Sequence, residues 1–457
     1  MPAQDLSFRP SSPPYLGHVE PPPAESYSTA AELLQENHTK WHIHFREFGG
    51  HNHTAHSLLT TLALGGSPAD LRRAYADDAP QQRPIPAVDW ALVRNMEAGE
   101  EAFRANMYRM ELYPTFLAFF DREIARQAGD WRAVVAKYCF ARTELAEMML
   151  TQLFEGLYHP FIHVALGVEF ELAGVVAEGL AHAASHPSGR LGELYERAEC
   201  LAAERAEERK RTPLMELYRA VRASPALRTA IHPSDGPRWL ENGVIGRALE
   251  EMAQVAAQFR VGLDEDGVER AMAEMISCAA YACGAAESGK SRGPDCGRKM
   301  DFFGMHGVTS SLSVTVMVRQ PWISTADKAR LVERKTRLDL ACYIASGTPE
   351  LREQNVLGYE PTLSKDIMDW DALYAAVRGE HDDGHAAKFV RAVKNGEDVT
   401  AQFSQESGVA TLLPVRGGSW FRLAQLCYDT TATGRVNVAE KWVWGIGLDH
   451  SRQVIPV

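Results

Sequence analysis

The sequence predicts an all-α protein built as one large multi-helix domain, or as two fused helical halves, with a short β-like segment near its end. Long stretches between residues 27 and 284 are rich in Ala, Leu, Glu and Arg and poor in Gly and Pro. Their apolar residues recur at three- and four-residue spacing, the period of an amphipathic helix. Because no strand-helix alternation and no fixed-period repeat is present, a parallel α/β fold is not expected.

Composition excludes several classes of protein. Apolar residues make up 45% of the 457 residues, enough for a large core. The net charge of −12 argues against nucleic acid or an anionic membrane as a partner. No apolar run is long enough to span a bilayer. Seven Cys without a CxxC pair form neither a disulfide framework nor a zinc ribbon. We therefore expect a cytoplasmic protein; its oligomeric state is not indicated.

Residues 1–26 are interpreted as a Pro-rich tail, and residues 27–457 as the helical catalytic domain. The tail lacks the basic start and apolar segment of a signal peptide, and it is expected to lie extended over the helical body. Helices are predicted in order at 130–158, 161–185, 189–210, 213–223, 246–260, 265–283, 302–317, 325–346, 364–378, 385–394 and 415–429. A Val- and Trp-rich run at 435–444 is typical of a strand.

A polar, Gly-rich segment at 284–299 is predicted to be a mobile loop. Its first eight residues match the P-loop string G-x-x-x-x-G-K-[ST], but a helical pattern precedes them and a helix cannot begin cleanly after them. No G-x-G-x-x-G fingerprint follows a strand, so a Rossmann-bound flavin or nicotinamide is unsupported. Cys278, Cys283 and Cys296 are interpreted as buried or loop thiols.

Sixteen His stand out, and several lie in short clusters. In residues 50–56 (GHNHTAH), which enter a helix ending at Gly65, His53 and His56 project about 60° apart, with His56 on the apolar side. His159 and His163 form an i, i+4 pair in a very apolar helix, the spacing that lets two imidazoles share an ion. Glu169 falls in line with His163 and could support it from behind.

Two further positions along the chain carry candidate metal ligands. The first is His306, which lies between two nearby Gly residues. His385 and Lys388 share the apolar side of a helix, and a buried Lys needs a reason because burial disfavours its charge. That reason could be a salt bridge, or a reaction of the neutral amine with CO2 to give a carbamate that ligates metal. Taken alone, each His is also compatible with a structural role. His18, His38, His232 and His450 are interpreted as surface or loop residues.

The elements HNHTAH, LYHPFIHVALGVEFE, MHGVTSS and DDGHAAKFVRAV, in this order, resemble the questin oxidase-like family over about residues 27–445. Members act largely in fungal aromatic polyketide pathways and open the central ring of anthraquinones. The family has been described as NADPH-dependent Baeyer–Villiger oxidases, and some members as non-heme iron dioxygenases with four His and a carbamylated Lys. Carried over, the resemblance implies these metal candidates: His56, one or both of His159 and His163, His306, His385, and Lys388 as the carbamate. Because five His are named for four places, one of them is a supporting residue, as are His53 and Glu169.

The resemblance implies an Fe(II)-dependent dioxygenase that uses O2 to cleave a C–C bond of an anthraquinone, or its hydroquinone, to a benzophenone-type acid. The alternatives are an NADPH-dependent Baeyer–Villiger-type monooxygenase on the same small aromatic substrates, although no NADPH fingerprint is present, and a non-catalytic helical binding protein with structural His. A flat substrate needs an apolar slot, for which sequence proximity suggests Phe302, Phe303, Met305 and Trp322. No catalytic residue beyond the metal centre is predicted.

Overall fold

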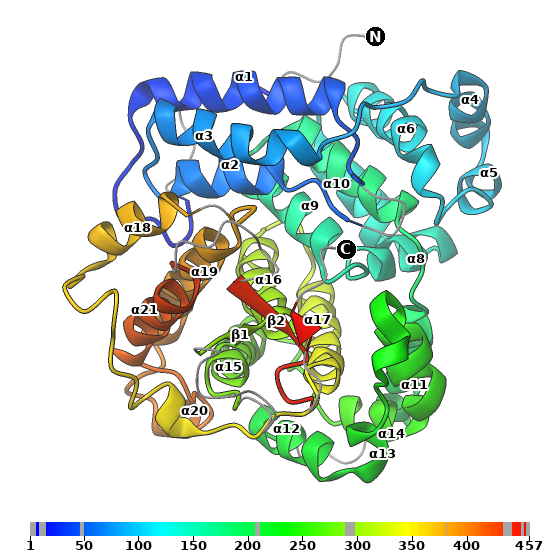
Figure 1. The fold of residues 1–457 in the computed structure, drawn as a ribbon. Helices are drawn as coiled ribbons and strands as arrows, with labels where there is room; N and C mark the ends of the chain where they lie inside the picture. Colours follow the sequence, from blue (N-terminus) through cyan, green and yellow to red (C-terminus); the bar gives the residue numbers. More distant parts are fainter. Residues whose placement is uncertain are drawn as a thin grey trace.

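Helices dominate the chain, which confirms the predicted all-α class (Figure 1). The structure is a computed structural model. It describes residues 6–8, 15–45, 50–205, 211–287, 298–380, 382–432, 441–448 and 452–453. None of the described helices is both long and apolar enough to cross a membrane.

The N-terminal third supplies a layer of helices over the central ones. Figure 1 shows α1, α2 and α3 in blue across one end of the molecule, where α2 contacts both α9 and α19. The elements of this third are α1 (Ala24–Lys40), α2 (Thr54–Ala63), α3 (Pro68–Asp78), α4 (Trp90–Ala98), α5 (Glu100–Arg104) and α6 (Tyr113–Arg126). The start of α3 is fixed by a capping box between Ser67 and Asp70.

Two predicted long helices are each divided in the structure. The segment 130–158 forms α7 (Trp131–Val135), a π-helical turn and α8 (Glu144–Gln152). The division occurs because Thr143 caps a new helix, its side chain accepting a hydrogen bond from the amide of Ala146. The segment 161–185 forms α9 (His159–Glu169) and α10 (Ala173–Ser185), joined through Glu171 at a φ of 56°.

The helices α9 and α10 pack closely because two glycines let their backbones approach. A Cβ at Gly167 would lie 2.6 Å from the amide nitrogen of Val176, and one at Gly179 would lie 2.7 Å from that of Val164. This hairpin places the His residues of α9 opposite those of α10, an arrangement that a single continuous helix could not produce.

The remaining helices confirm the predicted order, with shifted ends. The helix predicted at 364–378 begins later, at Trp370, because Asp369 caps it; the helix predicted at 385–394 continues to Ala401. Their bounds are α11 (Leu191–Glu204), α12 (Leu214–Ala223), α13 (Pro225–Arg228), α14 (Gly246–Ala256), α15 (Glu265–Gly284), α16 (Phe302–Val318), α17 (Thr325–Ala345), α18 (Trp370–Arg378), α19 (His385–Ala401), α20 (Ser407–Ala410) and α21 (Ser419–Thr431).

A small sheet confirms the predicted β-like segment. Strand β2 (Trp442–Trp444) pairs in parallel with β1 (Met300–Asp301) and antiparallel with β3 (Arg452–Gln453). Residues 433–440, where the predicted strand begins, lie outside the described residues. Strand β1 leads directly into α16, whose N-cap residue Asp301 accepts hydrogen bonds from the amides of Gly304 and Ile446. The sheet thus fixes the start of the helix that carries His306.

The described part of the N-terminal tail packs on the helical body. Tyr15 stacks on Phe170, and Arg391 donates a hydrogen bond to the carbonyl of Leu16. Helix α1 begins at Ala24, close to the predicted boundary. Of the loop predicted at 284–299, residues 288–297 lie outside the described residues; Gly284 ends a helix, which is the wrong setting for a P-loop.

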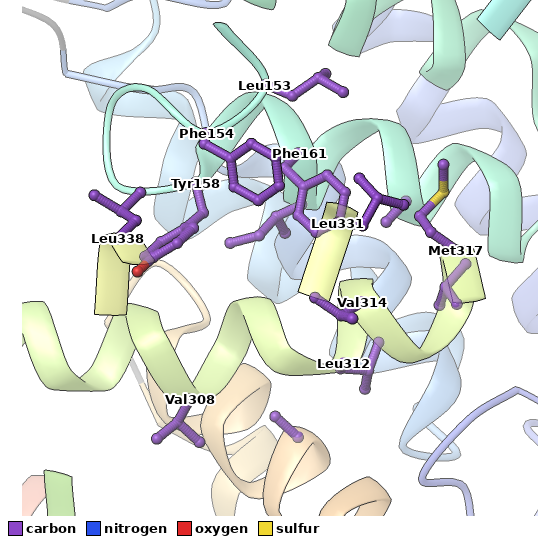
Figure 2. Packing of buried hydrophobic residues seen from close by; sticks show 14 of the residues in the cluster. Leu153, Phe154, Tyr158, Phe161, Val308, Leu312, Val314, Met317, Leu331 and Leu338 are labelled. Carbon is purple, nitrogen blue, oxygen red and sulfur yellow. The ribbon is translucent and has the colours of Figure 1, made fainter. Parts of the chain in front are cut away.

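The apolar core is continuous around α16. Figure 2 shows Phe161 over Val314 of α16 and near Leu331 of α17, with Phe154 next to it and Tyr158 beside Leu338 of α17. Phe154 and Phe161 stack with ring centres 4.9 Å apart. This dense packing holds the first turn of α9, which carries His159, against α16, which carries His306.

Candidate metal centre

Three histidines present the same nitrogen to a common region. The Nδ1–H groups of His159, His306 and His385 donate to backbone carbonyls: to Gly156 at 2.5 Å, Phe302 at 2.8 Å and Asp382 at 2.7 Å, respectively. A carbonyl can only accept, so Nδ1 carries the proton in each ring and Nε2 keeps its lone pair. This second hydrogen bond is typical of metal-ligating His, because it fixes the ring and raises its basicity.

The histidines converge from four elements. Nε2 of His53 lies 2.9 Å from Nε2 of His159, and nitrogens of His53, His159 and His385 all lie within 4.8 Å of one another. The ring of His306 is centred 4.9 Å from His159 and 5.4 Å from His385. With metal–nitrogen bonds of about 2.1 Å, adjacent ligands at 90° would be about 3.0 Å apart and tetrahedral ones about 3.4 Å. At 2.9 Å the two nitrogens are close enough to bind one ion together.

Lys388 completes the cluster from one turn further along α19. Its residue is only 6% exposed, and its amine makes neither a hydrogen bond nor an ion pair with any residue in the described ranges. Burial lowers the pKa of Lys388 to about 8, although the carboxylates of Asp382, Asp383 and Asp78 partly oppose this. A buried amine that is readily neutral is a candidate for covalent change or metal binding.

The four imidazole rings of the cluster are neutral, which is the charge state that metal binding requires. Burial first, and then neighbouring His and Lys388, hold the pKa values of His53, His159, His306 and His385 well below the ordinary value. The rings are therefore neutral near pH 7. Nε2 of His306 and Nε2 of His385 are buried and have no partner in the described part of the chain, which is costly unless an ion occupies the space between them. The residues thus fit a metal ion.

His56 and His163 lie at the edge of this group. Both ring nitrogens of His56 are buried without a partner among the described residues, and its ring is 5.1 Å from that of His163 and 5.7 Å from that of His53. His163 is different, because its Nε2–H donates to Glu178 at 2.8 Å. His53, which the sequence placed in a supporting role, lies in the centre of the group instead.

The buried carboxylate behind His163 is Glu178 of α10, so the assignment of Glu169 to that position is wrong. Glu169 accepts hydrogen bonds from Arg391 at 2.6 Å and from the amide of Leu16 at 2.8 Å, which ties it to the N-terminal segment. The reason is the break between α9 and α10, which folds α10 back and brings Glu178 to His163.

Glu178 is held between two imidazoles. It also accepts from His38, at 2.7 Å, so His38 is a buried residue and its interpretation as a surface residue is wrong. Burial alone would raise the pKa of Glu178, but the hydrogen bonds from His163 and His38 lower it to about 2. Burial would lower the pKa of His38, but the hydrogen bonds to Asp121 and Glu178 raise it to about 10. A negative charge thus lies permanently behind His163.

The predicted pocket residues are not all near the histidines. Phe302 contacts His306 edge-on at 4.4 Å and stacks on Trp444 with ring centres 5.6 Å apart. Phe303 turns toward Trp239 and lines a cavity with Asp301 and Ser346. Met305 is fully buried. Trp322 follows the far end of α16 and packs on Trp131, so its placement at the site is wrong, because the whole length of the helix separates it from His306.

A second group of histidines was missed in the sequence. It contains His44, His51, His182 and His186, all buried, and His51 stacks on His159 at 4.1 Å. Of the four, His51 appeared in a quoted motif without a role. The i, i+4 spacing of His182 and His186 on α10 was a signal that could have found the pair.

The chain is similar to known proteins over most of its length. A family model described as questin oxidase-like matches residues 50–393. The chain is 45% identical to a questin oxidase of Aspergillus fumigatus over 437 residues, 95% of each protein. It is 44% identical to the Baeyer-Villiger oxidase notM of an Aspergillus species, over 96% of this chain and 95% of that protein. It is 45% identical to the Baeyer-Villiger oxidase ptaJ of Pestalotiopsis fici, over 95% and 94%.

Proposed function

Because the chain belongs to the questin oxidase-like family, we propose that it is a non-heme Fe(II) dioxygenase that opens the central ring of an anthraquinone or its hydroquinone. The relatives are named as oxidases and monooxygenases and match nearly the whole chain, so the protein is an oxidoreductase. A small aromatic polyketide is the proposed substrate, and a benzophenone-type acid is the proposed product.

One observation carries the proposal: three His have Nδ1 bound to carbonyls, which leaves Nε2 as the free donor, and His159 and His385 place a nitrogen within 4.8 Å of one on His53. We assign His53, His159, His306 and His385 as the four imidazole ligands, and Lys388, as its carbamate, as the fifth. Imidazole and carboxylate donors together suit Fe(II). When bound, iron would supply the binding and activation of O2, and five protein ligands would leave one position of an octahedron open.

A carbamate on Lys388 would supply the negative charge that the proposed metal site otherwise lacks. Four neutral imidazoles leave the ion's charge of two uncompensated in a buried site, and an ammonium group would add to it. A carbamate reverses the sign of the side chain, from positive to negative, without moving the backbone. The lowered pKa of Lys388 makes the neutral amine available for reaction with CO2, which forms an N–C bond and releases one proton.

The chain also provides an aromatic surface beside the proposed ligands. The Phe302 ring stands between His306 and Trp444, with the Phe302 and Trp444 planes 18° apart. A flat quinone stacked on this pair would present its carbonyl edge toward the histidines. The buried surroundings exclude water from the reacting atoms.

Iron loading and isotope incorporation test the proposal. Apo-protein supplied with Fe(II), bicarbonate and the reduced anthraquinone should form product without NADPH, and product made under ¹⁸O2 should carry two labelled oxygen atoms. Protein that gains no activity from Fe(II) would refute iron dependence.

A second candidate is an NADPH-dependent Baeyer–Villiger-type monooxygenase, favoured by the names of several relatives. In that case the reaction would need NADPH and oxygen together, and one labelled atom would enter from O2. No dinucleotide fingerprint in the sequence supports bound NADPH.

A further inference from the structure

We propose that His44, His51, His182 and His186 form a second metal site, distinct from the centre around Lys388, that takes one first-row transition ion such as Zn(II). The four side chains come from three places in the fold: the segment after α1, the segment before α2, and the C-terminal end of α10. All four are at least nine-tenths buried.

The rings surround a common point. Their six pairwise centre-to-centre distances fall between 4.9 and 5.9 Å. Four imidazoles around a tetrahedral ion, with metal–nitrogen bonds of about 2.0–2.1 Å, place their ring centres about 5 Å apart. One nitrogen each from His44, His51 and His182 lies within 4.8 Å of the others. The arrangement therefore already approximates a four-coordinate site.

Three ring nitrogens of this group have no hydrogen-bond partner among the described residues, and Nε2 of His44 has only a long contact of 3.4 Å with Oγ of Ser185. Both ring nitrogens of His182 and Nδ1 of His44 are buried and unpaired within the described part of the chain. The Nδ1–H of His186 donates to the carbonyl of Pro187 at 2.8 Å, so its Nε2 keeps a lone pair, 3.1 Å from Nε2 of His51. Four buried imidazoles in contact, with so few hydrogen bonds, are costly unless something binds them.

Gly156 lets two of these imidazoles pack against its backbone. A Cβ at this position would lie 2.3 Å from Nε2 of His186 and 2.9 Å from Nε2 of His51. Any side chain here would therefore displace the two rings, so a glycine is needed for His51 and His186 to meet. Gly156 has a φ of +57°, and its carbonyl also accepts from His159, so this residue adjoins both groups of histidines.

The donor set selects the ion. The four donors are neutral imidazoles, without the carboxylate or carbamate that would favour a hard ion, and four-coordinate imidazole sites suit Zn(II) or copper. A buried negative charge lies on Glu178, one turn before His182 on the same face of α10. Its carboxylate lies behind His163, whose ring is 6.4 Å from that of His182.

Metal counting on the full chain tests the proposal. Protein stripped by a chelator and titrated with Zn(II) should bind about two ions per chain, and Co(II) at the second site should give the intense visible bands of four-coordinate cobalt. His182→Gln and His44→Gln, which alter different elements, should each bind about one ion and lose these bands. His385→Ala should lose the other ion and keep the bands, and His232→Gln should resemble the wild type.

Circular dichroism of each apo-variant checks that it is folded. The proposal is overturned if His182→Gln and His44→Gln fold and still bind two ions with unchanged cobalt bands. It is also overturned if the wild type binds a single ion that His385→Ala abolishes. Because every readout is metal content or a spectrum, these results do not depend on the proposed oxygenase activity.

Discussion

Nε2 of His53 lies 2.9 Å from Nε2 of His159, although 106 positions separate the two residues in the chain. Nδ1 of His159 already carries the ring proton, so its Nε2 can only accept. His53 must therefore donate from Nε2 in the metal-free protein, and must lose that proton or move it to Nδ1 when both nitrogens bind an ion. In the metal-free protein the two nitrogens share a hydrogen bond, and bonds from both nitrogens to a metal ion can replace it.

We predict that substitution of any proposed imidazole ligand abolishes iron binding. His53→Ala, His159→Ala, His306→Ala and His385→Ala should each retain less than about a tenth of the wild-type iron, because each leaves an incomplete donor set in a buried site. His163→Ala should retain more, since Nε2 of His163 is engaged by Glu178. Iron per chain measured by mass spectrometry checks this, with His232→Gln as the control. Equal loss in His163→Ala would place that residue among the ligands.

Reconstitution should depend on bicarbonate and rise with pH through about 8. The pKa of Lys388 is lowered, so its folded form resists protonation, and the neutral amine that reacts with CO2 increases as pH rises through the value of about 8. At pH 7 about a tenth of such an amine is neutral, against fewer than about one in a thousand for an ordinary Lys. With dissolved CO2 held constant, the initial rate of Fe(II) uptake should therefore increase about 25-fold between pH 6.5 and pH 8.5.

Lys388→Met provides the matched variant, because Met has similar length and cannot form a carbamate. It should show no dependence on bicarbonate and should lack the carbamate signal that wild-type protein gives in ¹³C NMR after exposure to ¹³CO2. Full iron content and activity in Lys388→Met would contradict the assignment.

Glu178→Gln should destabilise the protein most between about pH 4.5 and 6.5. The lowered pKa of Glu178 contributes stability above its ordinary value of 4.5, which is lost as pH falls toward 2. The raised pKa of His38 contributes stability below 6.5, which is lost as pH rises toward 10. Removing one partner of this buried pair should cost about 3–5 kcal/mol. Unfolding measured across this pH range checks the profile; a difference independent of pH would argue against the ionised pair.

Tyr158→Phe should weaken iron binding without removing a ligand. Asp339 accepts from the Tyr158 hydroxyl at 2.8 Å and pairs with Lys335 at 2.5 Å, and Lys335 donates to the carbonyl of Gly307 at 2.6 Å. These contacts fix the neighbours of His159 and His306. Loss of the hydroxyl should reduce iron affinity about tenfold and stability by about 1 kcal/mol.

Tyr343→Phe is the matched control for that substitution. Its hydroxyl donates to the carbonyl of Pro349 at 2.6 Å, from the same helix as Asp339 but away from the ligands. It should lose similar stability and keep the wild-type iron affinity, as judged by competition with a chelator. If both variants lose affinity equally, the effect of Tyr158 is one of general stability alone.

Phe302→Leu should raise KM for the quinone substrate while leaving iron content unchanged. The side chain lies against His306 and Trp444, where the proposed substrate would stack, and removal of the ring eliminates one aromatic contact worth about 1 kcal/mol, or roughly fivefold in KM. Trp322→Leu should leave KM unaltered because that residue packs on Trp131. Unchanged steady-state kinetics in Phe302→Leu would indicate that the substrate binds elsewhere.

The helical class, the order of the helices and the inward direction of His56, His163 and Lys388 followed from apolar periodicity. That periodicity is local, because it depends on side chains three or four positions apart. The family was likewise identified from short motifs, and the comparisons confirm it. The breaks near residues 140 and 171 were missed, since a cap at Thr143 and a left-handed residue at Glu171 compete with helical patterns that continue through both.

What the tertiary structure decided is which histidines meet. From the sequence, His159 and His163 are equally suited to bind metal. In the structure α10 folds back and brings Glu178 to His163, whereas His159 faces His53. Likewise His38 is buried only because α10 returns beside α1, and His182 joins His44 and His51 for the same reason. Ligand convergence depends on contacts between segments more than a hundred residues apart, and no local pattern in the sequence contains that information.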